Sequence, residues 1–307
     1  WAPQGAQAGL IDQLACRYAG NQLTGVTDHA GAYAAQGYVD GSAAAVDRTY
    51  DALGRMVTDL DRGVAVAYNQ LSLPEKVSNL ADPSDKIVYI YDAAGRKLAV
   101  RSNGKATVYA GSAVIDSAAA GAQLAFLLNS EGRLVPDGAN GYRTEYFLKD
   151  HLGNVRAVVA RNGSGARELV SASSYYPFGL EMAAQEVQSG TPNPYRYNGK
   201  ELQAFLSVAG RSLGWYDYGA RFYEPEIGRW QVVDSKSEKY NFLSPYNYVA
   251  NNPLILIDPN GQDIVWGGGV GGGDLFTGED AKRLLYQLQN RNSGKTNIFF
   301  GDKNQVS

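Results

Sequence analysis

The sequence has few of the residues that build metal sites and disulfide frameworks. Its only cysteine is Cys16, and its two histidines, His29 and His151, lie far apart in the chain. A single cysteine excludes an intrachain disulfide and a multi-cysteine zinc site, and the two histidines cannot supply a histidine-rich metal site alone. We therefore expect no metal and no cofactor, and we interpret Cys16 as a small buried hydrophobic residue.

The sequence also lacks an excess of charge and a long hydrophobic run. Its formal net charge is -3, which leaves no electrostatic argument for a nucleic acid or an anionic membrane surface as a partner. No apolar run reaches the roughly 18 residues that a membrane-spanning helix requires. Because the chain starts at Trp1 and stops at Ser307 without a closing element, we expect a fragment of a longer polypeptide.

Glycine and tyrosine, in contrast, are abundant, with 36 and 21 residues. This combination is typical of short strands that are joined by tight turns and that pack aromatic side chains along their length. Hydrophobic residues make up 44% of the chain and recur throughout it, which excludes a disordered composition. A chain of 307 residues is also long enough to bury a sizeable core.

A short repeat organises the first half of the chain. Residues 50–55 read Tyr-Asp-Ala-Leu-Gly-Arg and residues 91–96 read Tyr-Asp-Ala-Ala-Gly-Arg, with weaker copies at 129–133 and 150–154. The Asp or Asn can bond to its own backbone and start a turn, and the glycine supplies the positive φ that a short hairpin loop needs. Each unit is therefore predicted to be a β-hairpin, and the hairpins must pair edge to edge because a lone hairpin is marginal in water.

The segments around these loops predict the fold class. Residues 86–91 and 97–101 flank one loop as strands, and residues 145–148 and 155–159 flank another. Residues 162–165 form a loop, residues 184–194 a polar linker and residues 266–273 a glycine-rich spacer, and a short helix is predicted over 278–289. We expect an all-β protein of antiparallel hairpin repeats that form part of a curved β-shell, with this short C-terminal helix.

The later part of the chain carries an ordered series of motifs. It begins with Asp-His-Leu-Gly-Asn-Val-Arg at 150–156, Tyr-Pro-Phe-Gly at 176–179 and Tyr-Arg-Tyr-Asn-Gly-Lys-Glu at 195–201. The longest block spans residues 216–230, and Ser-Pro-Tyr-Asn-Tyr at 244–248, Asn-Asn-Pro at 251–253 and Asp-Pro-Asn-Gly at 258–261 follow it. With the Tyr-Asp repeats, this series resembles the Rhs/YD-repeat proteins and their RHS repeat-associated core domain over about residues 15–262.

The resemblance implies a division of the chain and a function. Hairpin repeats would occupy residues 1–141, the core domain residues 142–262, and the spacer and the start of a variable C-terminal segment residues 263–307. Such proteins form β-shells around a hollow interior, one end of which the core domain closes. In several members an aspartyl autoprotease cuts after Asp-Pro-x-Gly-Leu, and the segment beyond the cut is often a toxin. The expected partners are this effector segment, an immunity protein and a secretion machinery.

The candidate catalytic residues are Asp234 and Asp258. Two carboxylates that lie close together can share a proton, so that one activates water while the other protonates the leaving amine. The resemblance assigns the autoprotease aspartates to these positions, with a cleavage motif formed by Pro253, Pro259, Gly261 and Gln262. The alternative is that both aspartates are turn residues, as Asp-Pro and Asp-Ser commonly are.

Two residues depart from the family pattern. Ser235 stands where the family has proline, and Gln262 stands where it has leucine before the cut. We expect the cut to lie after Gln262, and we expect a pocket built for leucine to bind glutamine poorly and so to slow the reaction.

Other candidate residues have simpler interpretations. His151 lies in a turn motif, which favours a structural hydrogen bond. The aromatic residues of 215–248 could form a sugar-binding platform, but aromatics at alternating strand positions more often fill a core. Arg221 and Arg229 are equally consistent with carboxylate pairing and with a solvated surface. The glycine-rich 267–273 stretch lacks the Lys-Ser/Thr ending of a phosphate loop.

The sequence thus leaves three functions open. The first is a shell segment of a secreted or cell-surface polymorphic toxin, which holds a C-terminal effector and releases it, with self-cleavage near Gln262 as the route. The second is a passive cell-surface adhesion or carbohydrate-binding protein that uses the same repeats. The third is a self-cleaving enzyme in its own right, with the aspartate pair active. The segment that follows Ser307 in the full gene would discriminate between the first two.

Overall fold

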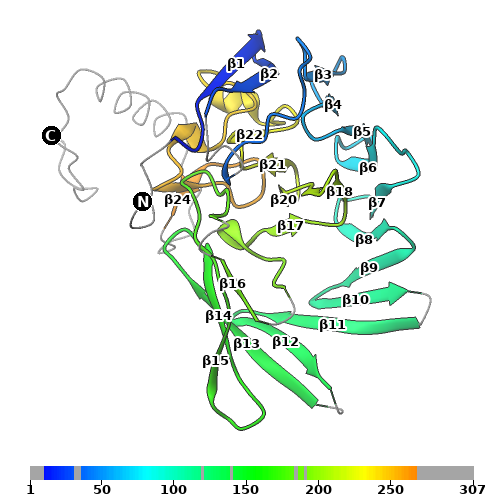
Figure 1. Ribbon diagram of the computed structural model, residues 1–307, viewed down its shortest axis with the longest axis vertical. Helices are drawn as coiled ribbons and strands as arrows, with labels where there is room; N and C mark the ends of the chain where they lie inside the picture. The colour runs from blue at the N-terminus through cyan, green and yellow to red at the C-terminus, as the bar shows by residue number, and fades with distance from the viewer. Residues whose placement is uncertain are drawn as a thin grey trace, which may run out of the picture. The chain divides into compact units, whose positions relative to one another are not determined.

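The computed structural model describes residues 10–30, 36–118, 121–138, 141–182, 186–189 and 192–267. In these ranges the protein is built from antiparallel strands and short 3-10 turns. A 14-stranded sheet contains consecutive strands in chain order, from β3 at one edge to β16 at the other (Figure 1). Its strands are β3 (Arg48–Tyr50), β4 (Met56–Asp59), β5 (Val64–Tyr68), β6 (Pro74–Asn79), β7 (Lys86–Tyr91), β8 (Lys97–Ser102), β9 (Lys105–Ala110), β10 (Ala113–Ala118), β11 (Gly121–Asn129), β12 (Gly132–Asp137), β13 (Gly141–Lys149), β14 (Val155–Arg161), β15 (Arg167–Ala172) and β16 (Val187–Gln188).

Smaller elements surround this sheet. The strands β1 (Leu14–Ala19) and β2 (Gln22–Asp28) form a separate hairpin, and four strands of residues 201–230 form a second sheet in the order β17-β20-β21-β22. These strands are β17 (Glu201–Gln203), β20 (Trp215–Asp217), β21 (Phe222–Glu224) and β22 (Arg229–Trp230). The remaining elements are β18 (Ser207–Val208), β19 (Arg211–Ser212), β23 (Leu256–Ile257), β24 (Val265–Trp266), η3 (Tyr197–Gly199), η4 (Ser237–Tyr240) and η5 (Val249–Asn251).

The Tyr-Asp repeat forms a loop of defined geometry. Asp51 Oδ1 accepts hydrogen bonds from the backbone amides of Leu53 and Arg55, both at 3.0 Å, and Asp51 Oδ2 accepts one from Arg55 Nε at 2.7 Å. Gly54 has a φ of 74° in this loop. The aspartate therefore closes the turn with its own carboxylate, the glycine allows the left-handed backbone, and the arginine neutralises the carboxylate.

The same loop recurs along the sheet. In each copy, one side-chain oxygen of the first residue accepts hydrogen bonds from the backbone amides two and four positions later. The further copies start at Asn69, Asp92, Asp150 and Asn162. The tyrosine that precedes the first residue in three copies reaches back to an earlier carbonyl. The Tyr50 hydroxyl donates to Leu23 O, the Tyr68 hydroxyl to Met56 O and the Tyr91 hydroxyl to Pro74 O. Each tyrosine thus ties its hairpin to the preceding part of the chain.

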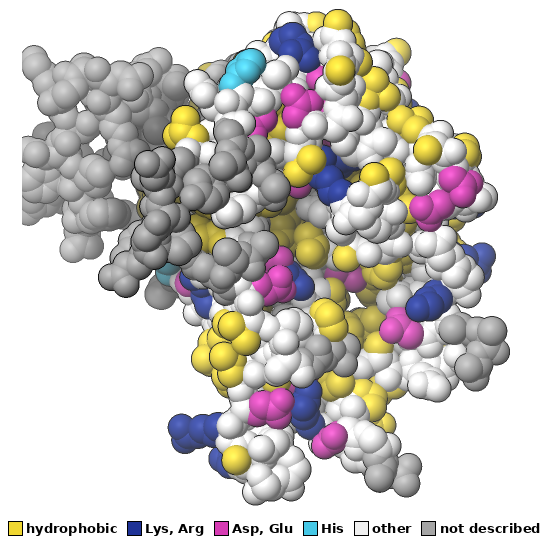
Figure 2. Space-filling view, viewed as in Figure 1, with side chains coloured by type: hydrophobic (Ala, Val, Ile, Leu, Met, Phe, Trp, Pro, Cys, Tyr) yellow, Lys and Arg dark blue, Asp and Glu magenta, His cyan; other side chains and the backbone are white. Residues whose placement is uncertain are grey.

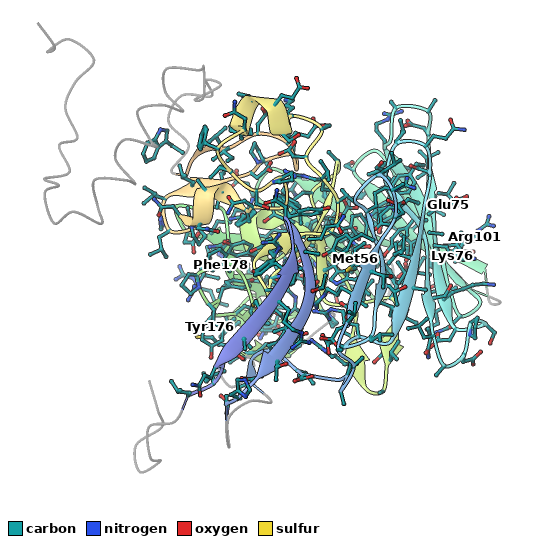
Figure 3. The ribbon with its side chains drawn as sticks, turned by 90° about the horizontal axis from the view of Figure 1, so that it is seen from above. Met56, Glu75, Lys76, Arg101, Tyr176 and Phe178 are labelled. Carbon is teal, nitrogen blue, oxygen red and sulfur yellow. The ribbon has the colours of Figure 1, made fainter. Side chains whose placement is uncertain are left out.

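The two faces of the large sheet differ in character. One face presents Val66, Val77, Ile87, Tyr89 and Val100 to a buried apolar cluster. The other face carries charged side chains. Lys76 and Arg101 lie there as the cross-strand neighbours of Val88, and Figure 3 shows Glu75, Lys76 and Arg101 on the side away from Met56. On the surface seen in Figure 2, basic and acidic side chains are interspersed.

Residues 195–267 pack against the apolar face of this sheet. Leu206, Leu213, Trp215 and Phe222 belong to the same buried cluster as the strand residues from β4 to β8. The aromatic side chains of this segment form its centre, and ten of them are buried: Tyr197, Trp215, Tyr216, Tyr218, Phe222, Tyr223, Trp230, Tyr240, Tyr246 and Tyr248. Trp215 and Phe222 contribute the aromatic surface to the cluster that joins the segment to the sheet, while most of the other rings pack on one another within the segment.

Buried ion pairs also cross this interface. Lys97 of β8 lies between Glu201 and Asp217, with its Nζ at 2.5 Å and 2.6 Å from the nearest carboxylate oxygens. Arg48 of β3 bridges Asp59 and Glu224, at 3.2 Å in both cases. Because a buried charge without a partner is strongly destabilising, these pairs restrict how the two parts can pack.

The structure confirms the fold class that the sequence predicts. The sheet is antiparallel and open, since β3 and β16 end its strand order in the described residues. The strands predicted at 86–91, 97–101, 145–148 and 155–159 correspond to β7, β8, β13 and β14. Strand order continues through β13 without a break at residue 142, so the hairpin architecture extends into the predicted core domain. The predicted helix at 278–289 lies outside the described residues.

Candidate functional site

Two loops of the 195–267 segment bring the predicted catalytic residues together. Asp234 follows β22 and precedes η4, and Asp258 directly follows β23. Both are buried, with exposed fractions of 8% for Asp234 and 2% for Asp258. The backbone amide of Asp234 donates to Pro245 O at 3.1 Å, which fixes its loop beside the segment that leads to Asp258.

Arg221 joins the two carboxylates. Its Nη2 lies 2.8 Å from Asp234 Oδ2 and 3.4 Å from Asp258 Oδ2, so these oxygens cannot be farther apart than the sum of the two distances. The guanidinium also stacks on Trp230, with 4.2 Å between its central carbon and the ring centre, and its Nε donates to Gly261 O. Arg221 is therefore a buried carboxylate partner, which is one of the two roles that the sequence left open.

Asp258 organises the loop that carries the predicted cut. Its Oδ1 accepts from the backbone amides of Asn260 at 3.1 Å, Gly261 at 2.7 Å, Gln262 at 3.1 Å and Asp263 at 3.3 Å. The turn role that sequence reasoning weighed against catalysis is thus real for Asp258. The same geometry also places this carboxylate against the nitrogen of the bond between Gln262 and Asp263.

The other residues of the predicted cleavage motif shape this loop. Gly261 has a φ of 83°, and a Cβ there would come within 2.9 Å of the Arg221 amide nitrogen, so only glycine fits without a shift. Pro253 is buried next to η5, and Pro259 is exposed with its carbonyl 2.6 Å from Lys200 Nζ. Gln262 is partly exposed, and its Nε2 donates to Ser235 Oγ at 2.8 Å.

The environment favours different charge states at neighbouring carboxyls. Burial raises the pKa of Asp258, and the opposing effects of Arg221 and the loop amides are smaller. Burial also lowers the pKa of Arg221, although both aspartates oppose this. At Asp263 burial acts to raise the pKa, but hydrogen bonds from Lys236 and Asn260 lower it below its ordinary value. The site therefore holds a carboxyl that protonates readily beside one that stays ionised.

A small cavity adjoins the two aspartates. Its volume is about 10 Å³, which is close to the space that one water molecule needs. Asp234, Asp258 and Arg221 line its polar side, and Tyr240 and Ile264 belong to its wall. The Ile264 amide donates to the Tyr240 hydroxyl at 3.2 Å, which holds the chain just beyond the predicted cut against this wall.

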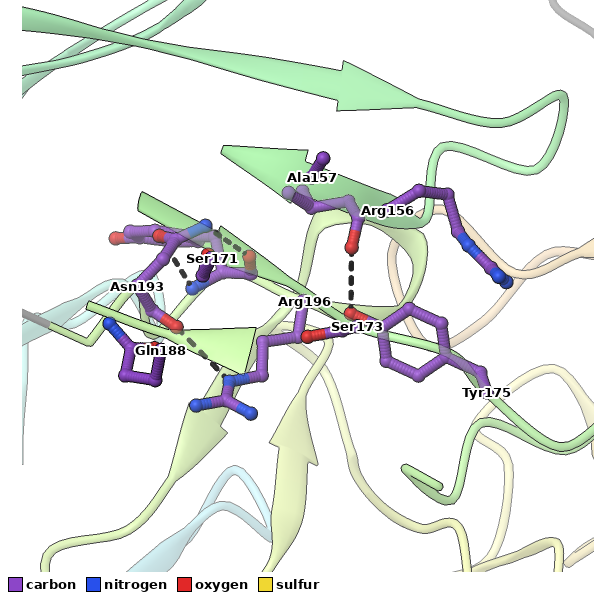
Figure 4. A pocket seen from close by; sticks show the side chains of 10 residues that line it. Arg156, Ala157, Ser171, Ser173, Tyr175, Gln188, Asn193 and Arg196 are labelled. Atoms are coloured by element: carbon purple, nitrogen blue, oxygen red, sulfur yellow. Dashed lines mark hydrogen bonds between the residues drawn. The ribbon is translucent and has the colours of Figure 1, made fainter. Parts of the chain in front are cut away.

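A second cavity of about 10 Å³ lies between β14, β15 and the strand-free stretch that contains Asn193 and Arg196 (Figure 4). Its polar groups bond to one another: Tyr175 OH donates to Val155 O at 2.9 Å and Arg196 Nε to Asn193 O at 3.1 Å. A space of this size suits about one water molecule, so we assign it no ligand.

The remaining candidates from the sequence lie outside the site. His151 Nε2 lies 3.0 Å from Leu254 O, in keeping with a structural hydrogen bond. Arg229 follows neither of the two alternatives, carboxylate pairing or a solvated surface. It donates to Asn21 O at 2.7 Å and stacks on Tyr18 and Tyr246. The prediction that Cys16 is buried is wrong, because β1 packs on the rest of the described chain so little that all its residues from Ala15 to Ala19 are exposed.

The aromatic residues of 215–248 fill a core, as the more common interpretation predicts. Their rings pack on one another, for example Tyr223 on Tyr248 with 4.2 Å between ring centres and Tyr218 on Trp230 at 5.1 Å. Because these rings are buried, they cannot act as a surface platform for sugars.

Sequence reasoning missed three residues that contact the predicted cleavage loop. Lys236 Nζ lies 2.5 Å and Lys239 Nζ 3.4 Å from the carboxylate of Asp263, and Asn260 Nδ2 donates to the same carboxylate at 3.1 Å. The available signal was a pair of lysines just after Asp234, opposite an acidic residue just after the predicted cut. Within the ranges that the structure describes, no cluster of His, Cys, Asp and Glu could hold a metal ion.

Sequence comparison finds relatives among toxin subunits. Toxin subunit YenC1 of Yersinia entomophaga is 34% identical over 99 residues, which are 32% of this chain and 9% of that protein. Toxin subunit YenC2 of the same organism is 38% identical over 96 residues, 31% of this chain and 9% of that protein. Salivary gland surface protein 1 of Aedes aegypti is 33% identical over 123 residues, 38% of this chain and 3% of that protein. No family model matches the chain.

Solved structures share the fold. The crystal structure of TcdB2-TccC3-Cdc42 aligns with a TM-score of 0.60 and 22% identity over 81% of this chain and 13% of that one. The Photorhabdus luminescens Tc holotoxin pore with the mutation TccC3-D651A aligns with a TM-score of 0.58 and 20% identity over 78% of this chain and 12% of that one.

The chain is thus similar in sequence to parts of toxin subunits and shares its fold with part of one chain of a Tc holotoxin pore. It spans less than a tenth of the length of each curated relative named above. None of the helices in the described part of the chain is long and apolar enough to cross a membrane.

Proposed function

We propose that this chain belongs to the shell of a secreted or cell-surface toxin, which encloses a C-terminal effector segment and releases it by cutting its own backbone between Gln262 and Asp263. One observation carries the proposal: the Asp263 amide nitrogen lies 3.3 Å from Asp258 Oδ1. The Asp258 carboxyl, in turn, shares the Arg221 guanidinium with Asp234. The curved open sheet and the similarity to toxin subunits support the encapsulation role.

Asp234 has the role of general base. Its ionised carboxylate takes one proton from a water molecule, and the resulting hydroxide attacks the carbonyl carbon of Gln262. The small cavity beside Asp234 and Asp258 has the volume for that water. Arg221 supports this role because its Nη2, 2.8 Å from Asp234 Oδ2, holds the carboxylate in place beside the cavity.

Asp258 has the role of general acid. Burial raises its pKa, so its protonated form is accessible. Because Oδ1 accepts the Asp263 amide in this structure, the proton is carried by Oδ2, and a turn of the carboxyl delivers it to the Asp263 nitrogen as the C–N bond breaks. The step consumes one water molecule and leaves a carboxylic acid on Gln262 and an amine on Asp263. The proton that Asp234 gained then restores the starting state through solvent. The rate should fall as pH rises through the pKa of Asp258.

The encapsulation proposal includes its partners. The effector segment would begin at Asp263, and an immunity protein and a secretion machinery are the further partners that a toxin of this kind requires. The alternative, a carbohydrate-binding surface protein, has less support, because the aromatic residues of 215–248 that could have held a sugar are buried.

Intact-mass analysis of the purified full-length protein tests the cut. The wild type should yield a fragment with Asp263 as its new N-terminus, and Asp234→Asn and Asp258→Asn should each remain intact while they keep the far-ultraviolet circular dichroism of the wild type. Asparagine preserves shape and loses the titration that proton transfer requires. Asp82→Asn, in an exposed loop, is the matched control and should be cut normally. An uncut wild type, or a cut at another bond, would overturn the proposal.

A further inference from the structure

Three consecutive side chains after β22 contact three different parts of the cleavage machinery. Asp234 reaches the guanidinium that it shares with Asp258. Ser235 accepts a hydrogen bond at its Oγ from the Gln262 side-chain amide at 2.8 Å. Lys236 places its Nζ 2.5 Å from Asp263 Oδ2. One turn therefore contacts both residues that flank the proposed scissile bond.

The backbone of this turn fixes the directions of these side chains. The Lys236 amide donates to Asp234 Oδ1 at 2.7 Å, and the Ser237 amide donates to Asp234 O at 3.0 Å. The aspartate that would act as the base thus also closes the turn that presents Ser235 and Lys236. Movement of Asp234 would displace all three contacts together.

The carboxylate of Asp263 is enclosed by donors on both of its oxygens. Lys236 and the Asn260 amide, the latter at 3.1 Å, bond to Oδ2, and Lys239 lies 3.4 Å from Oδ1. Only 13% of the Asp263 side chain is exposed. A site with two ammonium groups and one amide donor matches a carboxylate and disfavours an apolar or basic side chain.

The Gln262 side chain contacts a hydroxyl and not the apolar pocket that the sequence analysis predicts. An apolar pocket built for leucine would leave the Gln262 amide without a hydrogen bond, whereas the structure gives this amide a hydroxyl partner at 2.8 Å. Ser235 and Gln262 are the two residues that depart from the family pattern, and they contact each other. The hydroxyl at 235 thus compensates for the amide at 262.

We infer that Ser235, Lys236 and Lys239 form a recognition subsite that selects a side-chain amide before the cut and a carboxylate after it. The inference rests on the proposed self-cleavage. The subsite acts by holding the bond where the two catalytic aspartates can reach it, because in an intramolecular reaction the loss of such contacts lowers the fraction of time that the reacting groups are aligned.

Two double-mutant cycles test the subsite in the full-length protein. The measurement is the rate of appearance of the cut fragment after a pulse of cell-free synthesis. The first cycle combines Ser235→Ala with Gln262→Leu, and each single change should slow the cut roughly three- to tenfold. The second combines Lys236→Gln with Asp263→Asn, and each single change should slow it roughly 10- to 100-fold, because a charge-assisted contact is lost.

Within each cycle the double variant should be no slower than the slower single variant, since the second change removes a contact that is already lost. Ser84→Ala removes a similar hydroxyl from an exposed loop and Lys86→Gln a similar ammonium from an exposed position on β7, and both should leave the rate unchanged. Circular dichroism and melting temperature show that each variant is folded.

The outcomes separate this inference from the proposed function. A wild type that stays intact overturns both. A wild type that is cut, with single effects that multiply in the double variants or with no single effect at all, overturns the subsite and leaves self-cleavage in place.

Discussion

Asp61 is a carboxyl in a buried group of charged side chains. The Tyr38 hydroxyl donates to Asp61 Oδ2, and Arg48 Nη1 lies 3.8 Å from the same oxygen. Burial raises the pKa of Asp61 from 3.8 to about 6, against the lowering effects of Tyr38 and Arg48, and the nearby Asp59 and Asp47 raise it further. The folded protein therefore binds the Asp61 proton more tightly than the unfolded chain does.

This shift predicts how one substitution depends on pH. A raised pKa contributes stability that is complete below about pH 4 and is lost as pH rises through about 6. Asp61→Asn removes the titration and still accepts the Tyr38 hydroxyl, so its melting temperature relative to wild type should rise between pH 4 and pH 7. Melting curves at a series of pH values measure this.

Asp82→Asn provides a control. Hydrogen bonds from Ser84 lower the pKa of Asp82 below 3.8, so this carboxylate contributes stability that is lost only as pH falls below about 4, and the difference between this variant and the wild type should stay nearly constant from pH 4 to pH 7. A flat difference for Asp61→Asn across the range would show that Asp61 titrates normally.

At the scale of single elements, the hairpin loops differ in what surrounds them. The loop glycine Gly54 has a φ of 74°, and a Cβ there would lie 2.7 Å from the Tyr246 hydroxyl and 2.8 Å from Val233 Cγ2. Gly111 has a φ of 64° in the turn between β9 and β10, and no atom lies within 4 Å of a Cβ placed there. The two positions share the left-handed backbone but not the crowding.

We therefore expect alanine to be more destabilising at Gly54 than at Gly111. The backbone strain of a left-handed non-glycine residue, about 1–2 kcal/mol, applies to both, and only Gly54→Ala must also displace Tyr246, which donates to Gly54 O at 2.6 Å. Urea denaturation of both variants compares the free energies of unfolding. Equal losses at the two positions would mean that the contact between this loop and the 195–267 segment contributes little.

At the scale of the whole described structure, the large sheet and the 195–267 segment share one core. Trp215 is fully buried among strand residues of β4 to β8 and among Leu206, Leu213 and Phe222. Neither part buries this apolar surface without the other. The two parts should therefore unfold together.

Trp215→Ala tests this expectation. Loss of a large buried aromatic side chain should lower the free energy of unfolding by about 3–5 kcal/mol, and tryptophan fluorescence and far-ultraviolet circular dichroism should still report one coincident transition. Leu98→Ala, at a position on β8 that is 39% exposed, is the control and should change little. Two separated transitions in the wild type would show that the sheet is stable without the segment.

Local signals in the sequence determined the hairpins. The aspartate that bonds its own turn, the glycine with positive φ and the alternating strands act over a few residues, so residues 86–101 could be predicted nearly to their ends. The copy at Asn69 escaped notice because Ser72, with a φ of 60°, stands where the other loops have glycine. Such a residue gives no glycine signal even though the Asn69 side chain closes the same turn.

The candidate site was only partly determined by the sequence. Its motifs marked Asp234, Asp258 and the loop up to Gln262, because those residues lie in an ordered local series. Tertiary structure decided that Arg221 joins the two carboxylates and that Ser235, Lys236 and Lys239 meet Gln262 and Asp263. These contacts join residues 13 to 37 positions apart, and local pattern cannot show them, since they depend on how buried aromatic residues pack two loops together.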